Sequence, residues 1–206
     1  MPGIVISGTE GYANEAEALV KQYESLAFAD IHSKVLHLIP TTAARVLDIG
    51  AGTGRDAAGF AAMGHRVMAV EPTDALRSRA AELHPSPSIE WLDDSLPDLA
   101  QINSLGVAFD VVMLTAVWMH LDLAQRQRAK PRLAALLQPG GVMIMSLRYG
   151  PIPPGRRMFT VSAEETIQLA GTEGLQPILK FDSADGVLRR PGVSWARLAF
   201  RKDQDR

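Results

Sequence analysis

Apolar and polar residues follow two alternating patterns along this chain of 206 residues. Mostly apolar runs of strand length, each with one or two polar residues, occur at residues 45–49, 66–70, 88–92, 109–114 and 142–147. Such runs are typical of strands that are buried on both faces. Between them lie segments with apolar residues three or four positions apart, which favour amphipathic helices. Strands that alternate with helices predict an α/β fold built on a parallel sheet.

The segment before the first strand predicts two helices. Asn14 and Glu17 fit a capping box for the first helix. Asp30 is a candidate cap for the second helix, which Pro40 should end. Residues 1–12 are expected to form a loose lead.

Capping signals recur in the second half of the chain. Asp122 with Gln125, and Ser162 with Glu165, fit capping boxes at the starts of two helices. Pro131 is expected to kink or split the first of these helices, because proline lacks the N–H that the helix needs. The last two strands are expected at residues 177–181 and 193–200, and the polar tail RKDQDR is expected to fray.

The segment RVLDIGAGTGRDAA, residues 45–58, contains a strand, a glycine turn and the start of a helix. Gly50, Gly52 and Gly54 let the backbone approach a ligand, and a helix start offers unpaired N–H donors. Asp48 precedes the first glycine by two residues. A carboxylate there would repel the pyrophosphate of a dinucleotide, whereas it suits a ligand with an ammonium or sulfonium group.

The motif VLDIGAGTGRDA resembles the first motif of the class I S-adenosylmethionine (SAM)-dependent methyltransferases, and the order of segments is similar from Arg45 to Phe200. The sequence LQPGG, residues 137–141, matches a turn that recurs in this family before the fifth strand. The resemblance implies one three-layer, Rossmann-like domain over residues 1–206. It further implies a mostly parallel seven-stranded sheet with an antiparallel last strand, in a core at residues 45–200 behind an N-terminal helical cap at residues 1–40.

Glu71 is expected at the tip of the second strand, about twenty residues past the glycine turn, where a carboxylate can accept both ribose hydroxyls of a nucleoside. The resemblance implies that an acid after the third strand, Asp94 or else Asp93, accepts the adenine amino hydrogen. The residues expected to bind SAM, with S-adenosylhomocysteine as the product, are Asp48, Gly50, Ala51, Gly52, Gly54, Glu71, Pro72, Asp93, Asp94, Ser95, Thr115 and Ala116.

His120 is the best candidate for a general base, because its ordinary pKa lies near neutrality and it follows the fourth strand. A base is needed only if the acceptor loses a proton, and packing at a helix start is the alternative role. Tyr23, Trp118 and Met119 are candidate substrate contacts, with core packing as the alternative. A further set of basic residues, which could bind an anionic acceptor such as a carboxylate, comprises Arg148, Arg156 and Arg157.

Composition narrows the classes of function. The chain has no cysteine, which excludes disulfides, thiolate metal sites and the cysteine nucleophile of cytosine-C5 methylation in related enzymes. The net charge of −2 gives no sign of nucleic-acid binding, and no apolar stretch approaches membrane-spanning length. Without a basic leader the chain is expected to be a cytoplasmic protein with no metal, nucleic-acid or membrane partner. The sequence does not indicate an oligomeric state.

The leading hypothesis is therefore a SAM-dependent methyltransferase that acts on a small molecule. A SAM-binding regulatory or partner protein without transfer activity is the alternative, because methyl transfer needs few signature residues. An NAD-dependent oxidoreductase is less favoured, because the turn has GxGxG rather than GxGxxG spacing and follows Asp48. The sequence does not indicate the acceptor atom.

Overall fold

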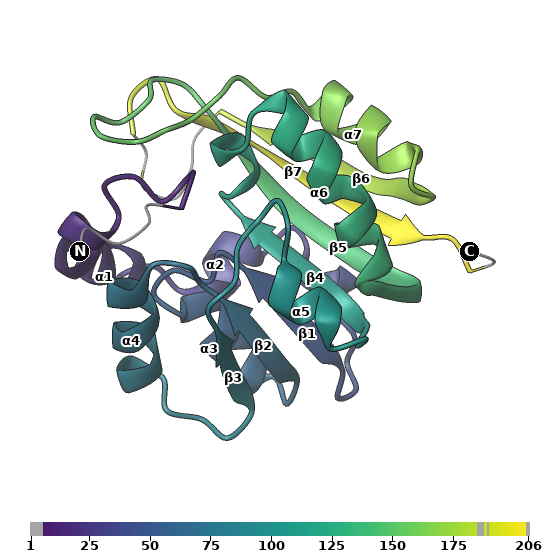
Figure 1. Cartoon of the computed structure of the whole chain (residues 1–206), viewed down its shortest axis with the longest axis horizontal. Coiled ribbons are helices and arrows are strands. Elements are labelled where there is room, and N and C mark those ends of the chain that lie inside the picture. The colour runs from purple at the N-terminus through teal and green to yellow at the C-terminus, as the bar shows by residue number, and fades with distance from the viewer. Residues whose placement is uncertain (1–5, 185–187, 189, 205–206) are drawn as a thin grey trace.

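The computed structural model describes residues 6–184, 188 and 190–204 of the chain. A seven-stranded sheet in the order β3-β2-β1-β4-β5-β7-β6 lies at its centre, with helices on both faces (Figure 1). The pairs from β3 to β5 are parallel, whereas β7 is antiparallel to β5 and to β6. This topology confirms the predicted Rossmann-like sheet and its antiparallel last strand. The strands are β1 Arg45–Ile49, β2 Arg66–Val70, β3 Ile89–Leu92, β4 Phe109–Thr115, β5 Leu137–Tyr149, β6 Leu175–Ser183 and β7 Ser194–Lys202.

Helices connect most of the strands and cover the sheet. The α-helices are α1 Ala16–Glu24, α2 Phe28–His32, α3 Arg55–Ala62, α4 Asp74–Leu83, α5 Ala100–Ser104, α6 Leu123–Ala135 and α7 Ala163–Gly171. Three short 3-10 turns are η1 Ala13–Glu15, η2 Leu36–Leu38 and η3 Trp118–His120. None of the helices in the described part of the chain combines the length and the apolar composition that crossing a membrane requires.

The central strand β4 separates two hydrophobic cores. Val112 and Leu114 belong to the core between the sheet and α5, α6 and α7. Val111 and Met113 belong to the core on the opposite face, which α2 and α3 cover. Successive side chains of a strand point to opposite faces, so a strand covered on both sides must be apolar at every position. The run FDVVML predicted a buried strand, and in the structure this strand lies in the middle of the sheet.

The capping predictions for the N-terminal helices were wrong. Asn14 lies inside the η1 turn, so α1 begins after Glu15 and has no side-chain cap. Helix α2 begins after Ala27, and Asp30 lies in its first turn instead of capping it. The reason is tertiary: the Phe28 ring packs edge-on against Phe60 of α3, with ring centroids 5.1 Å apart, which brings the start of α2 forward.

Pro131 does not split α6, which runs unbroken from Leu123 to Ala135. Ala129, Leu133 and Ala134 are buried on either side of the proline. Burial of an apolar side chain contributes about 1.5–3 kcal/mol, which offsets the roughly 3 kcal/mol that an internal proline costs a helix. Packing against the sheet therefore keeps the helix continuous.

The two capping boxes in the second half of the chain differ in outcome. Asp122 and Gln125 make both reciprocal bonds, as predicted. Ser162 Oγ accepts the Glu165 N–H at 3.0 Å, but the Glu165 carboxylate pairs with Arg126 Nε at 2.9 Å. The second box is therefore half formed, because a buried arginine from α6 competes for its glutamate.

The chain ends contribute more contacts than predicted. Residues 1–5 and 205–206, which belong to the expected loose lead and tail, lie outside the described residues. Tyr12, placed by the sequence in the loose lead, bonds His120. Lys202, placed in the frayed tail, ends β7 and donates from Nζ to the carbonyls of Ala134 and Leu137. Both segments are held by partners that are distant in the sequence.

Candidate functional site

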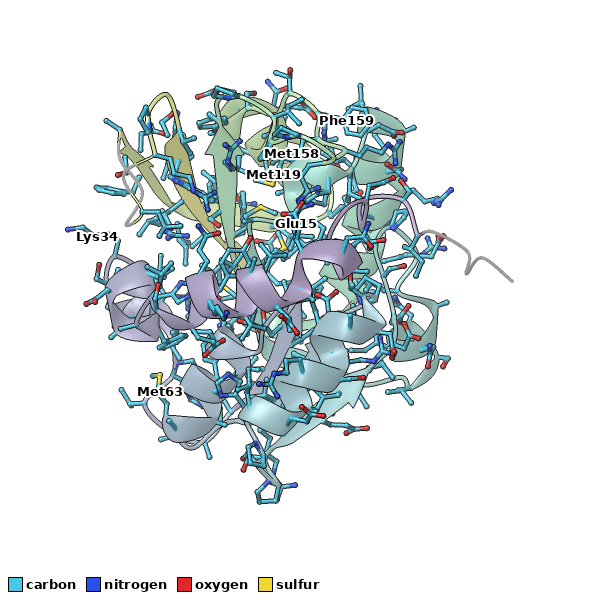
Figure 2. The ribbon with its side chains drawn as sticks, turned by 90° about the vertical axis from the view of Figure 1, so that its left-hand side faces the viewer. Glu15, Lys34, Met63, Met119, Met158 and Phe159 are labelled. Atoms are coloured by element: carbon cyan, nitrogen blue, oxygen red, sulfur yellow. The ribbon has the colours of Figure 1, made fainter. Side chains whose placement is uncertain are left out.

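A cavity of about 850 Å³ opens at the carboxyl ends of the parallel strands. Asp48 of β1, Glu71 after β2 and Thr115 of β4 border it. Its size lies in the range of small-molecule sites, and ligands of open α/β sheets bind at this edge. The helical segment that carries Glu15 borders the cavity as well and crosses the molecule on the side shown in Figure 2.

The glycine turn has a left-handed backbone at all three glycines, with φ of +70° at Gly50, +57° at Gly52 and +87° at Gly54. A Cβ at Gly50 would lie 2.5 Å from Val117 Cγ2, and one at Gly54 would lie 2.8 Å from the Trp91 ring. A Cβ at Gly52 would come no closer than 4.0 Å to another residue's atom. Gly50 and Gly54 are therefore required by packing within the protein, and Gly54 does not border the cavity.

Asp48 presents a carboxylate that lacks a full set of partners. The residue is buried at the end of β1, and its Oδ2 finds no hydrogen-bond donor among the described residues. Burial raises the pKa of Asp48 well above its ordinary value, and the charge of nearby Asp56 raises it further. A buried, unpaired carboxylate is costly, so this oxygen suits a cationic ligand group.

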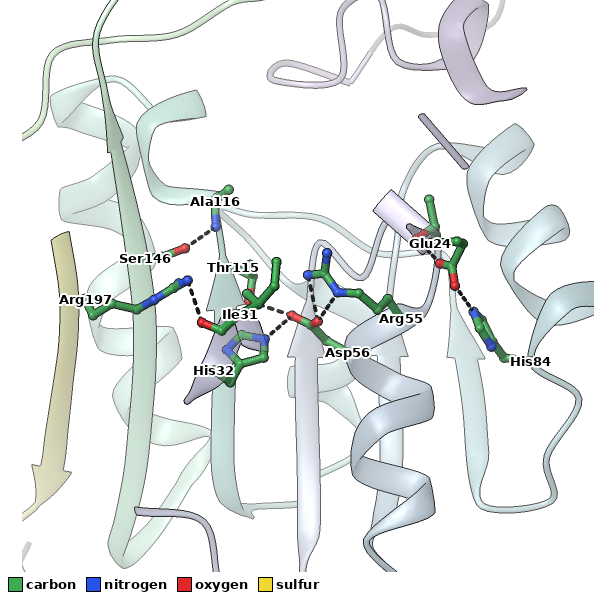
Figure 3. A network of polar contacts seen from close by, with 11 residues as sticks. Glu24, Ile31, His32, Arg55, Asp56, His84, Thr115, Ala116, Ser146 and Arg197 are labelled. Atoms are coloured by element: carbon green, nitrogen blue, oxygen red, sulfur yellow. Dashed lines mark hydrogen bonds and ion pairs between the residues drawn. The ribbon is translucent and has the colours of Figure 1, made fainter. Parts of the chain in front are cut away.

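Asp56, in the first turn of α3, has the opposite environment (Figure 3). Its carboxylate accepts hydrogen bonds from His32 Nε2 at 2.9 Å, Arg55 Nε at 2.8 Å and Thr115 Oγ1 at 2.8 Å. Burial alone would raise the pKa of Asp56, but the bond and charge of His32, with the Arg55 charge, hold it well below its ordinary value. The network ties the N-terminal α2 to the glycine turn. Sequence reasoning missed it, because nothing in the local pattern pairs His32 with Asp56.

Replacing His32 with alanine is expected to lower the free energy of unfolding by about 2–3 kcal/mol, the contribution of a hydrogen bond to a charged group. Asp56 keeps Arg55 and Thr115, so the fold should survive. Urea unfolding followed by circular dichroism measures the change. His37→Ala is the matched control, because His37 is exposed, and this variant should change the free energy of unfolding little. Equal stability of the two variants would contradict this role for His32.

Glu71 joins the tip of β2 to the glycine turn. Its Oε2 accepts the Gly52 N–H at 2.9 Å and its Oε1 accepts the Thr73 N–H at 2.8 Å. Burial raises the pKa of Glu71 above its ordinary value. A carboxylate has about four lone-pair sites, so two backbone bonds leave it able to accept two further hydrogens.

Of the two acids after β3, only Asp94 borders the cavity. Asp94 Oδ1 accepts the Ser95 N–H and Oδ2 accepts the Ile102 N–H, each at 2.9 Å, so its carboxylate also caps α5. Asp93 is exposed and pairs with Arg77. The remaining expected cofactor residues also border the cavity: Ala51, Pro72, Ser95, Thr115 and Ala116.

The expected acceptor residues divide into two groups. Tyr23, Arg148 and Arg156 border the cavity. Trp118 and Met119 do not border it. They are 2% and 1% exposed and lie in the core shared with α6 and α7; Met119 is labelled in Figure 2. The reason is the η3 turn, which directs these two side chains into the core. They fill the structural role that the sequence left as the alternative.

His120 borders the cavity and makes two hydrogen bonds that define its tautomer. Its Nδ1 lies 2.8 Å from the Arg157 carbonyl oxygen, which can only accept, so Nδ1 carries the hydrogen of the neutral ring. Its Nε2 therefore accepts the Tyr12 hydroxyl at 3.0 Å. Burial lowers the pKa of His120 and raises the pKa of Tyr12, so both groups are neutral at neutral pH. Tyr12 is 108 residues away in sequence, and no pattern pointed to it.

Comparison with known proteins shows which family part of this sequence matches. Residues 46–141, which include the glycine turn, Glu71 and Asp94, match the model of a methyltransferase domain. Residues 46–141 of this chain form a methyltransferase domain. A relative, an uncharacterized methyltransferase of Geobacillus kaustophilus, is 28% identical over 138 residues, which cover 66% of this chain and 61% of the relative. One of Mycobacterium tuberculosis is 35% identical over 108 residues, which cover 50% of this chain and 40% of the relative. The aligned segments thus span about half the length of these relatives.

Solved methyltransferase structures share the whole fold of this domain. The 1,6-didemethyltoxoflavin-N1-methyltransferase of Burkholderia thailandensis, solved with its substrate and S-adenosylhomocysteine, has a TM-score of 0.67 at 20% identity and covers 98% of this chain and 93% of its own. The N-methyltransferase NodS of Bradyrhizobium japonicum, solved with S-adenosylhomocysteine, has a TM-score of 0.69 at 17% identity and covers 92% of this chain and 97% of its own. At these identities the likeness establishes the fold.

Proposed function

We propose that this chain is a SAM-dependent methyltransferase that acts on a small-molecule acceptor and releases S-adenosylhomocysteine. The observation that carries the proposal is the row of three buried acids around one cavity: Asp48, Glu71 and Asp94 at successive strand ends. The unpartnered Asp48 oxygen matches a cationic group, and Glu71 retains acceptor sites for two hydroxyls. Structural neighbours that were solved with S-adenosylhomocysteine support this proposal.

In this proposal each acid binds a different part of SAM. Asp48 attracts the cationic methionine portion, Glu71 accepts the ribose hydroxyls, and Asp94 accepts the adenine amino hydrogen. When bound, SAM supplies a methyl group that its sulfonium already activates. The chain then has to align the acceptor and keep water out, which can contribute several kcal/mol to the lowering of the barrier.

Tyr12 and His120 form the part of the site that can take a proton. When the acceptor loses a proton, the Tyr12 hydroxyl accepts it and passes its own hydrogen to His120 Nε2, 3.0 Å away. The Arg157 carbonyl, already bonded to Nδ1, stabilises the imidazolium that results. The low pKa of His120 keeps Nε2 free to accept at neutral pH.

Titration calorimetry with S-adenosylhomocysteine tests the proposal. The wild-type protein should bind it, and Glu71→Gln should raise the Kd about tenfold, because a neutral amide replaces a charged acceptor and such bonds differ by about 1–1.5 kcal/mol. Asp93→Asn, which alters an exposed neighbouring acid, is the matched control and should bind normally. If folded wild-type protein releases no heat of binding with millimolar ligand, the proposed function is wrong.

A further inference from the structure

The two sides of the cavity carry opposite charges. The ends of β1, β2 and β3 contribute Asp48, Glu71 and Asp94, which face the space that the proposed function assigns to SAM. The opposite side contributes Arg148 of β5 and Arg190, which lies before the start of β7. Because SAM is attracted by the acidic side, the basic side is left for the other reactant.

Several of the basic residues that border the cavity already have partners, and Lys34 lies over the Phe181 ring, 5.5 Å from its centroid. Arg156 pairs with Glu15 at 2.8 Å and lies over the Tyr12 ring, 4.1 Å from its centroid. Arg55 pairs with Asp56 at 2.8 Å. Arg197 donates to the Ile31 carbonyl at 2.9 Å (Figure 3). Arg157, which pairs with Asp122, does not border the cavity. These residues therefore have little need of an anion from outside.

Arg148 differs from them. It lies near the end of β5, two residues past Ser146, whose Oγ accepts the Ala116 N–H at 2.9 Å on the cavity floor. Its Nε is buried without a hydrogen-bond partner, and it forms no ion pair with any residue that the structure describes. Burial lowers the pKa of Arg148, and so does the positive charge of Arg190. Arg190 likewise has no carboxylate partner in the described ranges.

Two arginines that repel each other in a partly buried site are unfavourable unless an anion lies between or beside them. A guanidinium offers a planar fork of donors that matches a carboxylate or a phosphate. Tyr23 and Trp195 border the same side, and Trp195 is the register partner of Arg148 in β7. Their rings offer flat apolar surface next to the charged groups.

We propose that the methyl acceptor carries an anionic oxygen group, a carboxylate or a phosphate, that Arg148 binds together with Arg190. This inference rests on the proposed function and adds the charge class of the substrate. The anion would lie on the far side of the cavity from Glu71, so that the acceptor spans the space between Arg148 and the Tyr12–His120 pair.

Calorimetric titration of the protein saturated with S-adenosylhomocysteine tests this inference with three probes of similar shape: benzoate, phenyl phosphate and benzamide. At least one anion should bind at least tenfold more tightly than the neutral amide, and the better anion identifies the group. Arg148→Gln should weaken the binding of that anion by about tenfold or more while leaving the affinity for S-adenosylhomocysteine unchanged. Arg128→Gln, which alters an arginine paired with Asp98 on the exposed face of α6, is the control and should behave as the wild type does.

Each other result has a definite meaning. If neither anion binds, if benzamide binds as well as they do, or if Arg148→Gln binds them as the wild type does, the inference is wrong. If the wild type does not bind S-adenosylhomocysteine, the proposed function fails separately, and the same titrations on the protein alone still test Arg148.

A transfer assay gives a second readout with natural compounds. A metabolite extract is divided on an anion-exchange column before it is mixed with the protein and methyl-labelled SAM. Label should enter the retained, anionic fraction and should fall with Arg148→Gln. Label that enters only the unretained fraction overturns the inference.

Discussion

Replacing His120 with glutamine is expected to lower kcat for methyl transfer by about 10²- to 10⁴-fold, the range that general base catalysis contributes. The Tyr12 hydroxyl, 3.0 Å from His120 Nε2, would lose the imidazole to which it can pass a proton. The Kd for SAM should stay the same, because the acids that bind it lie at other strand ends. Release of S-adenosylhomocysteine under saturating substrates measures the loss.

The pH dependence separates this catalytic role from a structural one. Burial lowers the pKa of His120 below its ordinary value of 6.5, so kcat/KM should rise with pH in the acidic range and be level at neutrality. That rise should disappear in His120→Gln. Tyr12→Phe should also slow transfer, and Tyr149→Phe, outside the cavity, should not. Full activity of His120→Gln with an unchanged profile would mean that the acceptor reacts without losing a proton to the enzyme.

Replacing Asp48 with asparagine is expected to weaken SAM binding about a hundredfold and to stabilise the free protein. The binding loss follows because a buried charge pair that loses one member costs roughly 3–5 kcal/mol, and the side-chain amide recovers part of this. The stability gain follows because Asp48 Oδ2 is buried and finds no hydrogen-bond donor in the described part of the chain. Calorimetry and urea unfolding measure the two effects, with Asp93→Asn as the exposed control.

The stability gain should depend on pH in a defined direction. Burial raises the pKa of Asp48 in the folded chain above its pKa in the unfolded chain. At a pH between these two pKa values the folded state therefore binds more protons than the unfolded state does. Wild-type stability therefore falls as pH rises through the folded pKa, and Asp48→Asn lacks this fall. Below the ordinary pKa of aspartate, the free energies of unfolding of the wild type and of Asp48→Asn should become similar. SAM binding should release a proton near the folded pKa. A variant with unchanged affinity and stability would refute the role of Asp48.

The ranges of the buried strands and the place of Glu71 were predictable because both depend on local pattern. A strand that is covered on two faces is apolar at nearly every position, so the apolar runs predicted both β2 and β4. Glu71 follows β2 directly and Asp94 lies two residues past the end of β3, so their placement at one edge of the sheet follows from parallel pairing. The predicted helix cap at Asp30 was wrong because Phe28 packs against Phe60 and α2 begins earlier, and the predicted cap at Asn14 was wrong because that residue lies inside the η1 turn.

In the sequence by itself, periodicity predicted the buried strands and the helices between them, and spacing predicted the glycine turn and the place of Glu71, while the resemblance to the methyltransferases implied the seven-stranded sheet and an acid at Asp94 or Asp93. Only the tertiary structure decided that Tyr12 pairs with His120, that His32 and Arg55 bond Asp56, and that Arg148 has no ion-pair partner among the described residues. The first of these contacts joins residues 108 positions apart, and no local preference encodes such a distance. Which charges neutralise one another depends on how the chain folds back, because Coulomb interactions follow separation in space and not separation along the sequence.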